Sequence, residues 1–394
     1  MHYLNRVVTG LAFTKPQQKF LQTLFSAWLS IRGRVNFLQL SRCSSNSEKY
    51  YRRWFSRYID WTTFYLRVLK LLGIGKCLIA IDNVTWAKAG KKTYGFANFW
   101  SSSDKKMIKG IDFLSMALVS QEWKTGFHIN AVQNNRSLSN VDERMQLQIC
   151  FLEDELKKLR GITEWVVGDG NFARRKFIDV VTGQGFKFIS KLRQDAELFH
   201  LFTGLQPVKG RKRKMDGKVD WKDQSRMNFV GYHNGCTVYE LNGFNYKFNR
   251  VVKAVYIYDP KAKDYMILMC TDVQTSALMI IEYYRLRFQI EFLYRDTKQH
   301  CSLSTCQSQK KEALLFHVNA AMTSVNLAKA DILRENHFDP ETIFSLSDYI
   351  QRNSNILLTQ RIIARLGFEL SQRKRTSLIR HSASFGLIHV ARAA

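Results

Sequence analysis

The stretch Cys77-Leu78-Ile79-Ala80-Ile81-Asp82 decides the fold, because five apolar residues in a row end at a carboxylate. Gly73 and Gly75 precede it and mark a break, so a short buried strand is expected over 77–82. A second apolar run, Trp165-Val166-Val167, ends in the same way at Gly168-Asp169-Gly170. Strand ends are where sites are built in α/β sheets, so this pattern predicts a sheet with a polar edge.

The segments around these two runs predict helices and further strands. Phe113–Val119 and Phe127–Val132 are expected strands, and 141–160 is an expected helix with one apolar stripe. Phe186–Leu192 is an expected strand after the one at 165–167. Three strands, a helix and two more strands predict an α/β core with a mixed sheet.

The rest of the chain differs from this core. Aromatic and basic side chains share the helical segment 50–72, which suits contact with a DNA backbone, although a basic solvated face over an ordinary helical core is the alternative. A basic loop, Lys209–Lys214, and a hairpin turn at Asn234-Gly235 lie in a strand-rich segment. The expected units are a helical N-terminal DNA-binding domain (1–72), the first part of the core (73–195), a β-rich insertion (196–275), the second part of the core (276–330) and a C-terminal helical region (331–394).

The charge of the chain predicts a polyanionic partner. Sixty Lys and Arg stand against 33 Asp and Glu, giving a formal net charge of +27 over 394 residues. Such an excess attracts nucleic acid through counterion release, with a membrane surface or a merely basic soluble protein as alternatives. No apolar run is long enough to cross a bilayer and no lipidation motif is evident, so no membrane partner is expected.

The cysteines and glycines exclude several other classes. Seven cysteines without a CxxC pair predict no disulfide framework and a reducing compartment. His300, Cys301, Cys306 and His317 match no common zinc spacing. The sequence contains no GxxxxGK[ST] loop, so an ATP-driven mechanism is not expected.

A polar helix face carries the third acid. Tyr284, Arg287, Glu291 and Lys298 are offset by three, four and seven residues in an expected helix over 277–300, which places them within about 60° of one another. The opposite side is apolar and can pack on the sheet (Met279, Leu286, Ile290 and Leu293). From this pattern alone, a solvated helix with an Arg–Glu pair is the alternative.

Three carboxylates with nearby cations suit phosphodiester chemistry. Mg²⁺ prefers oxygen ligands and binds through a few carboxylates together with phosphate and water. Two such ions about 4 Å apart can activate an attacking oxygen and stabilise a leaving one. Arg, Lys and Tyr on the same face can then hold phosphates without displacing the metals.

In this combination the sequence resembles the DDE transposases of bacterial insertion sequences, in the insertion-sequence-four branch. The branch signature is Tyr, two residues, Arg, three residues, Glu, six residues, Lys, and Tyr284-x2-Arg287-x3-Glu291-x6-Lys298 matches every defined position. Ile81-Asp82-Asn83-Val84-Thr85 is similar to the first-Asp motif, and Gly168-Asp169-Gly170-Asn171-Phe172 to the second. The motifs span residues 78 to 298 in the expected order.

The resemblance implies an RNase H-like mixed sheet with flanking helices, interrupted by the β-rich insertion. It implies metal-dependent cleavage at transposon ends and strand transfer into target DNA, which is cut-and-paste transposition. Asp82, Asp169 and Glu291 would be the catalytic residues and the ligands of two Mg²⁺ ions, with Mn²⁺ as a substitute.

The resemblance also implies the partners. Tyr284, Arg287 and Lys298 would contact DNA, and the active form would be a homodimer on double-stranded DNA of transposon ends and target. The expected location is the bacterial cytoplasm, at the nucleoid. Some relatives stack a base on a Trp of the insertion, and here the insertion contains only Trp221.

Two other functions stay open from the sequence. An RNase H-like nuclease would cut without joining strands. A domesticated or decayed relative would bind DNA without cutting it, although intact acids at all three positions argue against this.

Overall fold

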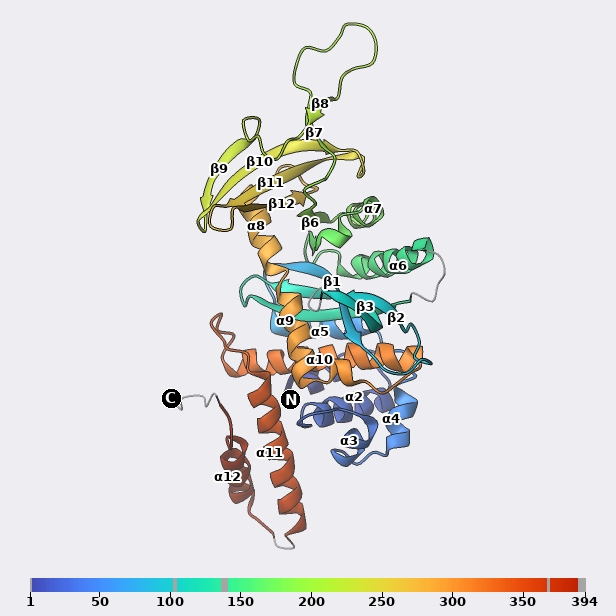
Figure 1. Cartoon of the computed structure of the whole chain (residues 1–394). Coiled ribbons are helices and arrows are strands. Elements are labelled where there is room, and N and C mark those ends of the chain that lie inside the picture. The colour runs from blue at the N-terminus through green and yellow to red at the C-terminus, as the bar shows by residue number, and fades with distance from the viewer. Residues whose placement is uncertain (1, 102–104, 136–140, 367–368, 389–394) are drawn as a thin grey trace.

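The computed structural model describes residues 2–101, 105–135, 141–366 and 369–388. The molecule is elongated, with the β-rich insertion at one end, the α/β core in the middle and a helical hairpin at the other end (Figure 1). The N-terminal helices lie beside the core on the side away from the insertion (Figure 1).

The strands of the described ranges form one mixed sheet. Those of the core are β1 Cys77–Ala87, β2 Ala97–Ser101, β3 Lys106–Ser120, β4 Thr125–Asn134, β5 Trp165–Gly168 and β6 Lys187–Leu192. β3 is antiparallel to β1, β2 and β4, whereas β1, β5 and β6 run parallel in that order. This mixed pairing confirms the α/β core expected from the apolar runs.

Residues 196–275, the segment expected to be a β-rich insertion, contain further strands. These strands are β7 Leu198–Leu201, β8 Met215–Lys218, β9 Asn228–His233, β10 Cys236–Asn245, β11 Arg250–Asp259 and β12 Asp264–Cys270. β12 pairs with β6, so the insertion continues the core sheet and is not a detached layer. The sequence did not predict β2, β7 and β8, because strands of four or five residues are too short to show a clear pattern.

Helices cover the core sheet. They are α6 Val141–Leu159 and α7 Arg175–Gly183 between core strands, then α8 Ala277–Leu286, α9 Gln289–His300 and α10 Lys311–Glu335 after the insertion. α9 and α10 both pack on β4. Gly126 in β4 makes this approach possible, because a Cβ there would lie 2.9 Å from the carbonyl oxygen of Gln289.

The single helix expected over 277–300 is wrong, because the chain tightens between α8 and α9. The amide of Phe288 donates to the carbonyl of Arg285, and the amide of Glu291 donates to that of Phe288, which are three-residue spacings. Nothing in the sequence marks this turn, since it contains neither Pro nor Gly. Because of this turn, Tyr284 lies in α8 and Glu291 lies in α9, so the two halves of the motif are on separate helices.

The N-terminal helices share their core with α10. They are α1 His2–Thr9, α2 Lys15–Trp28, α3 Phe37–Arg42, α4 Glu48–Trp54 and α5 Trp61–Leu72. The Asp60 side chain caps the start of α5, and Gly73 ends it in the left-handed conformation. Phe316 of α10 lies 4.3 Å from the Phe55 ring and 5.2 Å from the Trp61 ring, centroid to centroid.

Two buried asparagines fasten α10 to β4, which pairs only with β3 among the described strands. Asn326 accepts from the amide of His128 at 2.8 Å and donates to its carbonyl at 2.7 Å. The Asn319 side-chain oxygen lies 2.8 Å from Nε2 of His128 and accepts from the amide of Ala131 at 3.0 Å. These amides therefore satisfy backbone groups that an edge strand would otherwise leave open.

We expect Asn319→Leu to destabilise the protein by about 2 kcal/mol, because it leaves the buried Nε2 of His128 without its partner and leaves the amide of Ala131 with only the Asn130 side chain as acceptor. Burial lowers the pKa of His128 to about 4, so this imidazole is neutral at pH 7. Urea unfolding measures the change, with Gln299→Leu on the exposed part of α9 as the control. A loss below about 1 kcal/mol would show that the amide does not anchor the edge.

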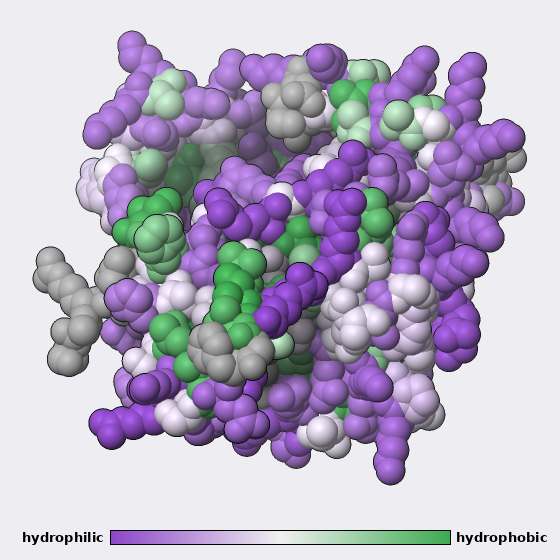
Figure 2. All heavy atoms as spheres, turned by 90° about the horizontal axis from the view of Figure 1, so that it is seen from below, coloured by the Kyte–Doolittle hydropathy of each residue, from purple (hydrophilic) through white to green (hydrophobic). Residues whose placement is uncertain are grey.

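Helices α11 Leu346–Arg365 and α12 Gln372–Ala383 form a hairpin that projects from the core (Figure 1). The hairpin is tied to α10 because the Tyr349 hydroxyl donates to Asp331 at 2.7 Å. Viewed from this end, the surface is mainly hydrophilic, with a smaller group of apolar side chains near its middle (Figure 2). Within the described ranges, no helix combines the length and apolar character that crossing a membrane requires.

Candidate active site

The register of two parallel strands brings Asp82 and Asp169 together. Ile81 in β1 is paired with Gly168, the last residue of β5, and Asp82 and Asp169 are the next residues along the chain. Their backbones are therefore roughly 5 Å apart, the spacing of neighbouring strands. Gly168 allows close packing at this point, since a Cβ there would lie 3.1 Å from the Ile81 and Phe172 side chains, which would have to shift slightly.

Asp82 does not end its strand, which corrects the expectation for residues 77–82. β1 continues to Ala87 because the long β3 pairs with it as far as Gly110. The parallel pairing with β5, however, stops at Ile81. Asp82 thus lies just past the end of the parallel pairing, at the point where β5 no longer runs beside β1.

Neighbouring groups fix both aspartates. The hydroxyl of Tyr294 in α9 donates to the backbone carbonyl of Asp82 at 3.1 Å, which ties the Glu291 helix to β1. Asn171 donates to the Asp169 carboxylate twice, from its amide at 2.9 Å and from its side chain at 3.0 Å. The Ser190 hydroxyl donates to the Asp169 carbonyl at 2.7 Å.

Arg287 joins the third acid to the first. Its guanidinium forms an ion pair of 2.8 Å with Glu291 and a longer one of 3.7 Å with Asp82. The Arg287 side chain is only 6% exposed, whereas that of Glu291 is 45% exposed. Asp82 and Glu291, which are 209 positions apart in the sequence, therefore flank one buried cation.

The carboxylates act on one another electrostatically. Burial, together with the smaller effects of Asp169 and Glu291, raises the pKa of Asp82 to about 7, although Arg287 lowers it. Burial works against the charge of Arg287, but Asp82, Tyr284 and Glu291 outweigh it and raise the pKa of the guanidinium. The site therefore concentrates negative charge around a single buried cation.

Tyr284 and Lys298 make different contacts near this cluster. The Tyr284 ring is buried, with the Arg287 guanidinium 5.5 Å from its centroid, and burial raises the pKa of its hydroxyl. Lys298 is exposed on α9, and its ammonium donates to the carbonyl of Thr85 at 3.4 Å. Of the three expected DNA contacts, only Lys298 has an exposed side chain in this conformation.

The three carboxylates have the chemistry that a hard cation such as Mg²⁺ prefers, but their present arrangement does not match a metal site. Carboxylate oxygens from Asp82, Asp169 and Glu291 are the ligands that Mg²⁺ prefers. Across the described ranges, however, no three His, Cys, Asp or Glu side chains are arranged to hold a metal ion. In this arrangement the Glu291 carboxylate is paired with Arg287.

Sequence reasoning missed three supporting residues. Tyr294 follows Glu291 by three positions, so helical spacing predicts that the two lie close together on the helix, but not that Tyr294 contacts β1. Asn171 follows Asp169 by two positions, the spacing of an Asx turn. Asp112 is a buried acid that bonds to the Thr85 hydroxyl, and only the pairing of β1 with β3 reveals that contact.

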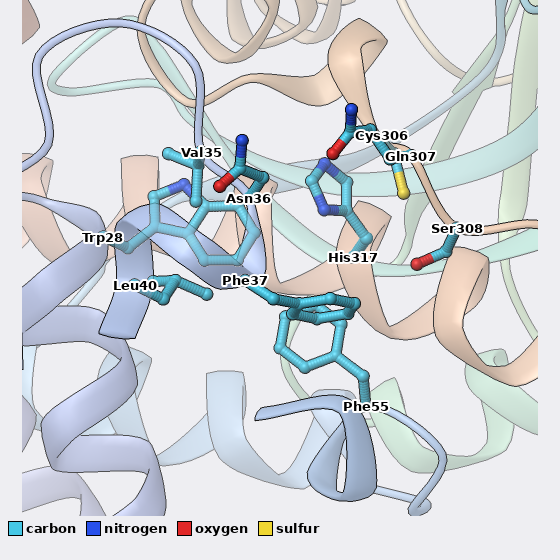
Figure 3. Close-up of a pocket in the computed structure, with 10 residues that line it drawn as sticks. All are labelled: Trp28, Val35, Asn36, Phe37, Leu40, Phe55, Cys306, Gln307, Ser308 and His317. Carbon is cyan, nitrogen blue, oxygen red and sulfur yellow. The ribbon is translucent and has the colours of Figure 1, made fainter. Parts of the chain in front are cut away.

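A separate pocket lies between the N-terminal helices and the segment before α10 (Figure 3). Its lining is mainly apolar and aromatic and includes Trp28, Phe55, Cys306 and His317. Burial raises the pKa of the Cys306 thiol, but His317 more than offsets this and lowers it to about 7. His300 and Cys301, considered above with this pair for zinc, do not line the pocket.

A family model for the transposase DDE domain matches residues 122–327, slightly more than half of the chain. The chain belongs to the DDE transposase family. The matched range contains Asp169 and the whole segment from Tyr284 to Lys298, whereas Asp82 lies before it. A comparison with curated proteins found no match.

Proposed function

We propose that this member of the DDE transposase family is a DNA transposase of the insertion-sequence-four type. It would cut DNA at transposon ends and join those ends to target DNA. The observation that carries the proposal is the juxtaposition of Asp82 and Asp169 by strand register, with Glu291 linked to Asp82 through Arg287. The mixed order of β4, β3, β1, β5 and β6 supports an RNase H-like core.

The three acids would hold two Mg²⁺ ions, with Mn²⁺ as a substitute. When bound, these ions would activate the attacking oxygen and stabilise the leaving oxygen of the phosphodiester. Tyr294 and Asn171 would keep the backbone of Asp82 and the carboxylate of Asp169 in place. Arg287 would neutralise Asp82 and Glu291 until the metal ions take over that charge.

We propose the same division of the chain as the sequence suggested. Residues 1–72 would contact DNA, 73–195 and 276–330 would form the catalytic core, and 196–275 would be the insertion. The basic chain and the joining of two DNA ends suit a homodimer on double-stranded DNA at the bacterial nucleoid. Trp221 is only 5% exposed and stacks on Tyr256 with ring centroids 6.4 Å apart, so we do not assign it a base-stacking role.

The test uses purified protein and duplex DNA carrying the ends of its own element. With Mg²⁺ or Mn²⁺ present, we expect cleavage at the ends and covalent joining to a target plasmid. Cleavage without joining would identify a nuclease. Binding without either reaction would identify a non-catalytic relative.

We expect Lys298→Ala to reduce the slope of log affinity against log salt by about 1, because one phosphate contact is lost. Fluorescence anisotropy at several salt concentrations measures the slope. Lys298→Arg keeps the charge and should retain most of the slope. An unchanged slope in the alanine variant would remove Lys298 from the DNA interface.

A further inference from the structure

A basic loop projects from the end of the insertion that is farthest from the N-terminal helices (Figure 1). It joins β7 to β8 over residues 202–214, with the sequence Phe-Thr-Gly-Leu-Gln-Pro-Val-Lys-Gly-Arg-Lys-Arg-Lys. Connections this long without secondary structure are uncommon in compact domains and are usually functional or disordered. We call residues 202–214 the basic arm.

The base of the arm is held by specific contacts. The Gln206 side chain closes the loop with two hydrogen bonds to the backbone of Arg213. It donates to the carbonyl at 2.7 Å and accepts from the amide at 2.9 Å. The guanidinium of Arg213 pairs with Asp216 at 2.8 Å and lies 4.9 Å from the centroid of the Phe202 ring. The arm is therefore a shaped loop on a stem, not a loose linker.

Much of the positive charge of the arm is not neutralised. Lys209, Arg211, Lys212 and Lys214 are all exposed, and none of them pairs with an acid in the part of the chain that the structure describes. Asp216 is already shared between Arg213 and Arg226, each at 2.8 Å. Five positive charges lie within the six residues 209–214, four of them unpaired among the described residues, and their mutual repulsion would be relieved by a bound polyanion.

We propose that the basic arm binds the phosphate backbone of duplex DNA, independently of base sequence and away from the carboxylate site. The proposal rests on the function proposed above, because it takes DNA to be the substrate. Lys and Arg side chains on an exposed loop position DNA through phosphates without reading bases. The arm would thus hold the DNA flanking the cut, at the opposite side of the insertion from the N-terminal helices.

The test compares two variants that remove the same number of charges from the insertion. The arm variant replaces Lys209, Arg211, Lys212 and Lys214 with Ala. The control variant replaces Lys222, Lys247, Lys261 and Lys263, which are also exposed. Both variants are made in the full chain that also carries Asp82→Asn, so that DNA binding is measured without cleavage. The result of this binding test therefore does not depend on whether the proposed catalytic activity is right.

Binding is measured to a labelled duplex of arbitrary sequence that spans several helical turns. The arm variant should bind at least about tenfold more weakly at about 0.1 M salt, with its salt slope reduced by about 3 to 4. The control should change by less than about half of that slope. Exchanging Lys209, Lys212 and Lys214 for Arg should preserve binding, and thermal unfolding of the arm variant should match the parent.

Three outcomes would overturn the proposal. Equal weakening by both variants would show a general effect of net charge. Unchanged DNA binding by the arm variant would remove the arm from the interface. Loss of binding to anionic phospholipid vesicles or to an acidic peptide, with DNA binding intact, would assign the arm to another partner.

Discussion

Replacement of Asp82 or Asp169 by Asn, or of Glu291 by Gln, is expected to reduce DNA cleavage at least about 1,000-fold. That loss corresponds to about 4 kcal/mol of transition-state stabilisation, which is a reasonable share for metal-ion catalysis. We expect this loss because β1, β5 and α9 each bring one carboxylate to the same end of the parallel strands. Gel assays of end cleavage with Mg²⁺ and Mn²⁺ measure the effect.

DNA binding should stay within about threefold of the parent, because removing one carboxylate from a basic protein takes away repulsion and not attraction. Glu282→Gln is the matched control, since Glu282 is exposed on the neighbouring helix α8. It should cleave normally. Full activity in any one of the three site variants would exclude that carboxylate from the catalytic set.

The second large effect is expected at Arg287. Arg287→Met keeps much of the side-chain volume but leaves Asp82 and Glu291 without their shared cation. Removing one partner of a buried ion pair lowers the free energy of unfolding by about 3–5 kcal/mol. We expect a loss of about 2–4 kcal/mol here because Glu291 is half exposed. Urea unfolding without metal ions measures the loss of stability.

Two further variants separate charge from shape at this position. Arg287→Lys retains the charge but not the two-pronged geometry, so it should restore only part of the stability. Glu291→Gln removes the exposed partner and should cost less than about 1 kcal/mol. If Arg287→Met unfolds at the same urea concentration as the parent, the guanidinium does not neutralise this site.

Local pattern was sufficient for much of the fold. The hairpin turn expected at Asn234-Gly235 joins β9 to β10, because both residues adopt the positive φ that such a turn requires. The helix expected over 141–160 matches α6 within one residue, because its apolar stripe repeats at helical spacing. The break after Leu286 was not predictable, since packing and not a Pro or Gly sets it.

By itself, the sequence determined which segments form buried strands, that Asp82 and Asp169 follow such segments, and that a Tyr-Arg-Glu-Lys motif lies far downstream. These properties depend on periodicity and composition over short windows. Only the tertiary structure decided that Arg287 lies between Asp82 and Glu291, that Tyr294 ties α9 to β1, and that Asn319 and Asn326 close the edge of β4. Those contacts join residues about two hundred positions apart, and they arise from strand register and helix packing, which no local pattern encodes.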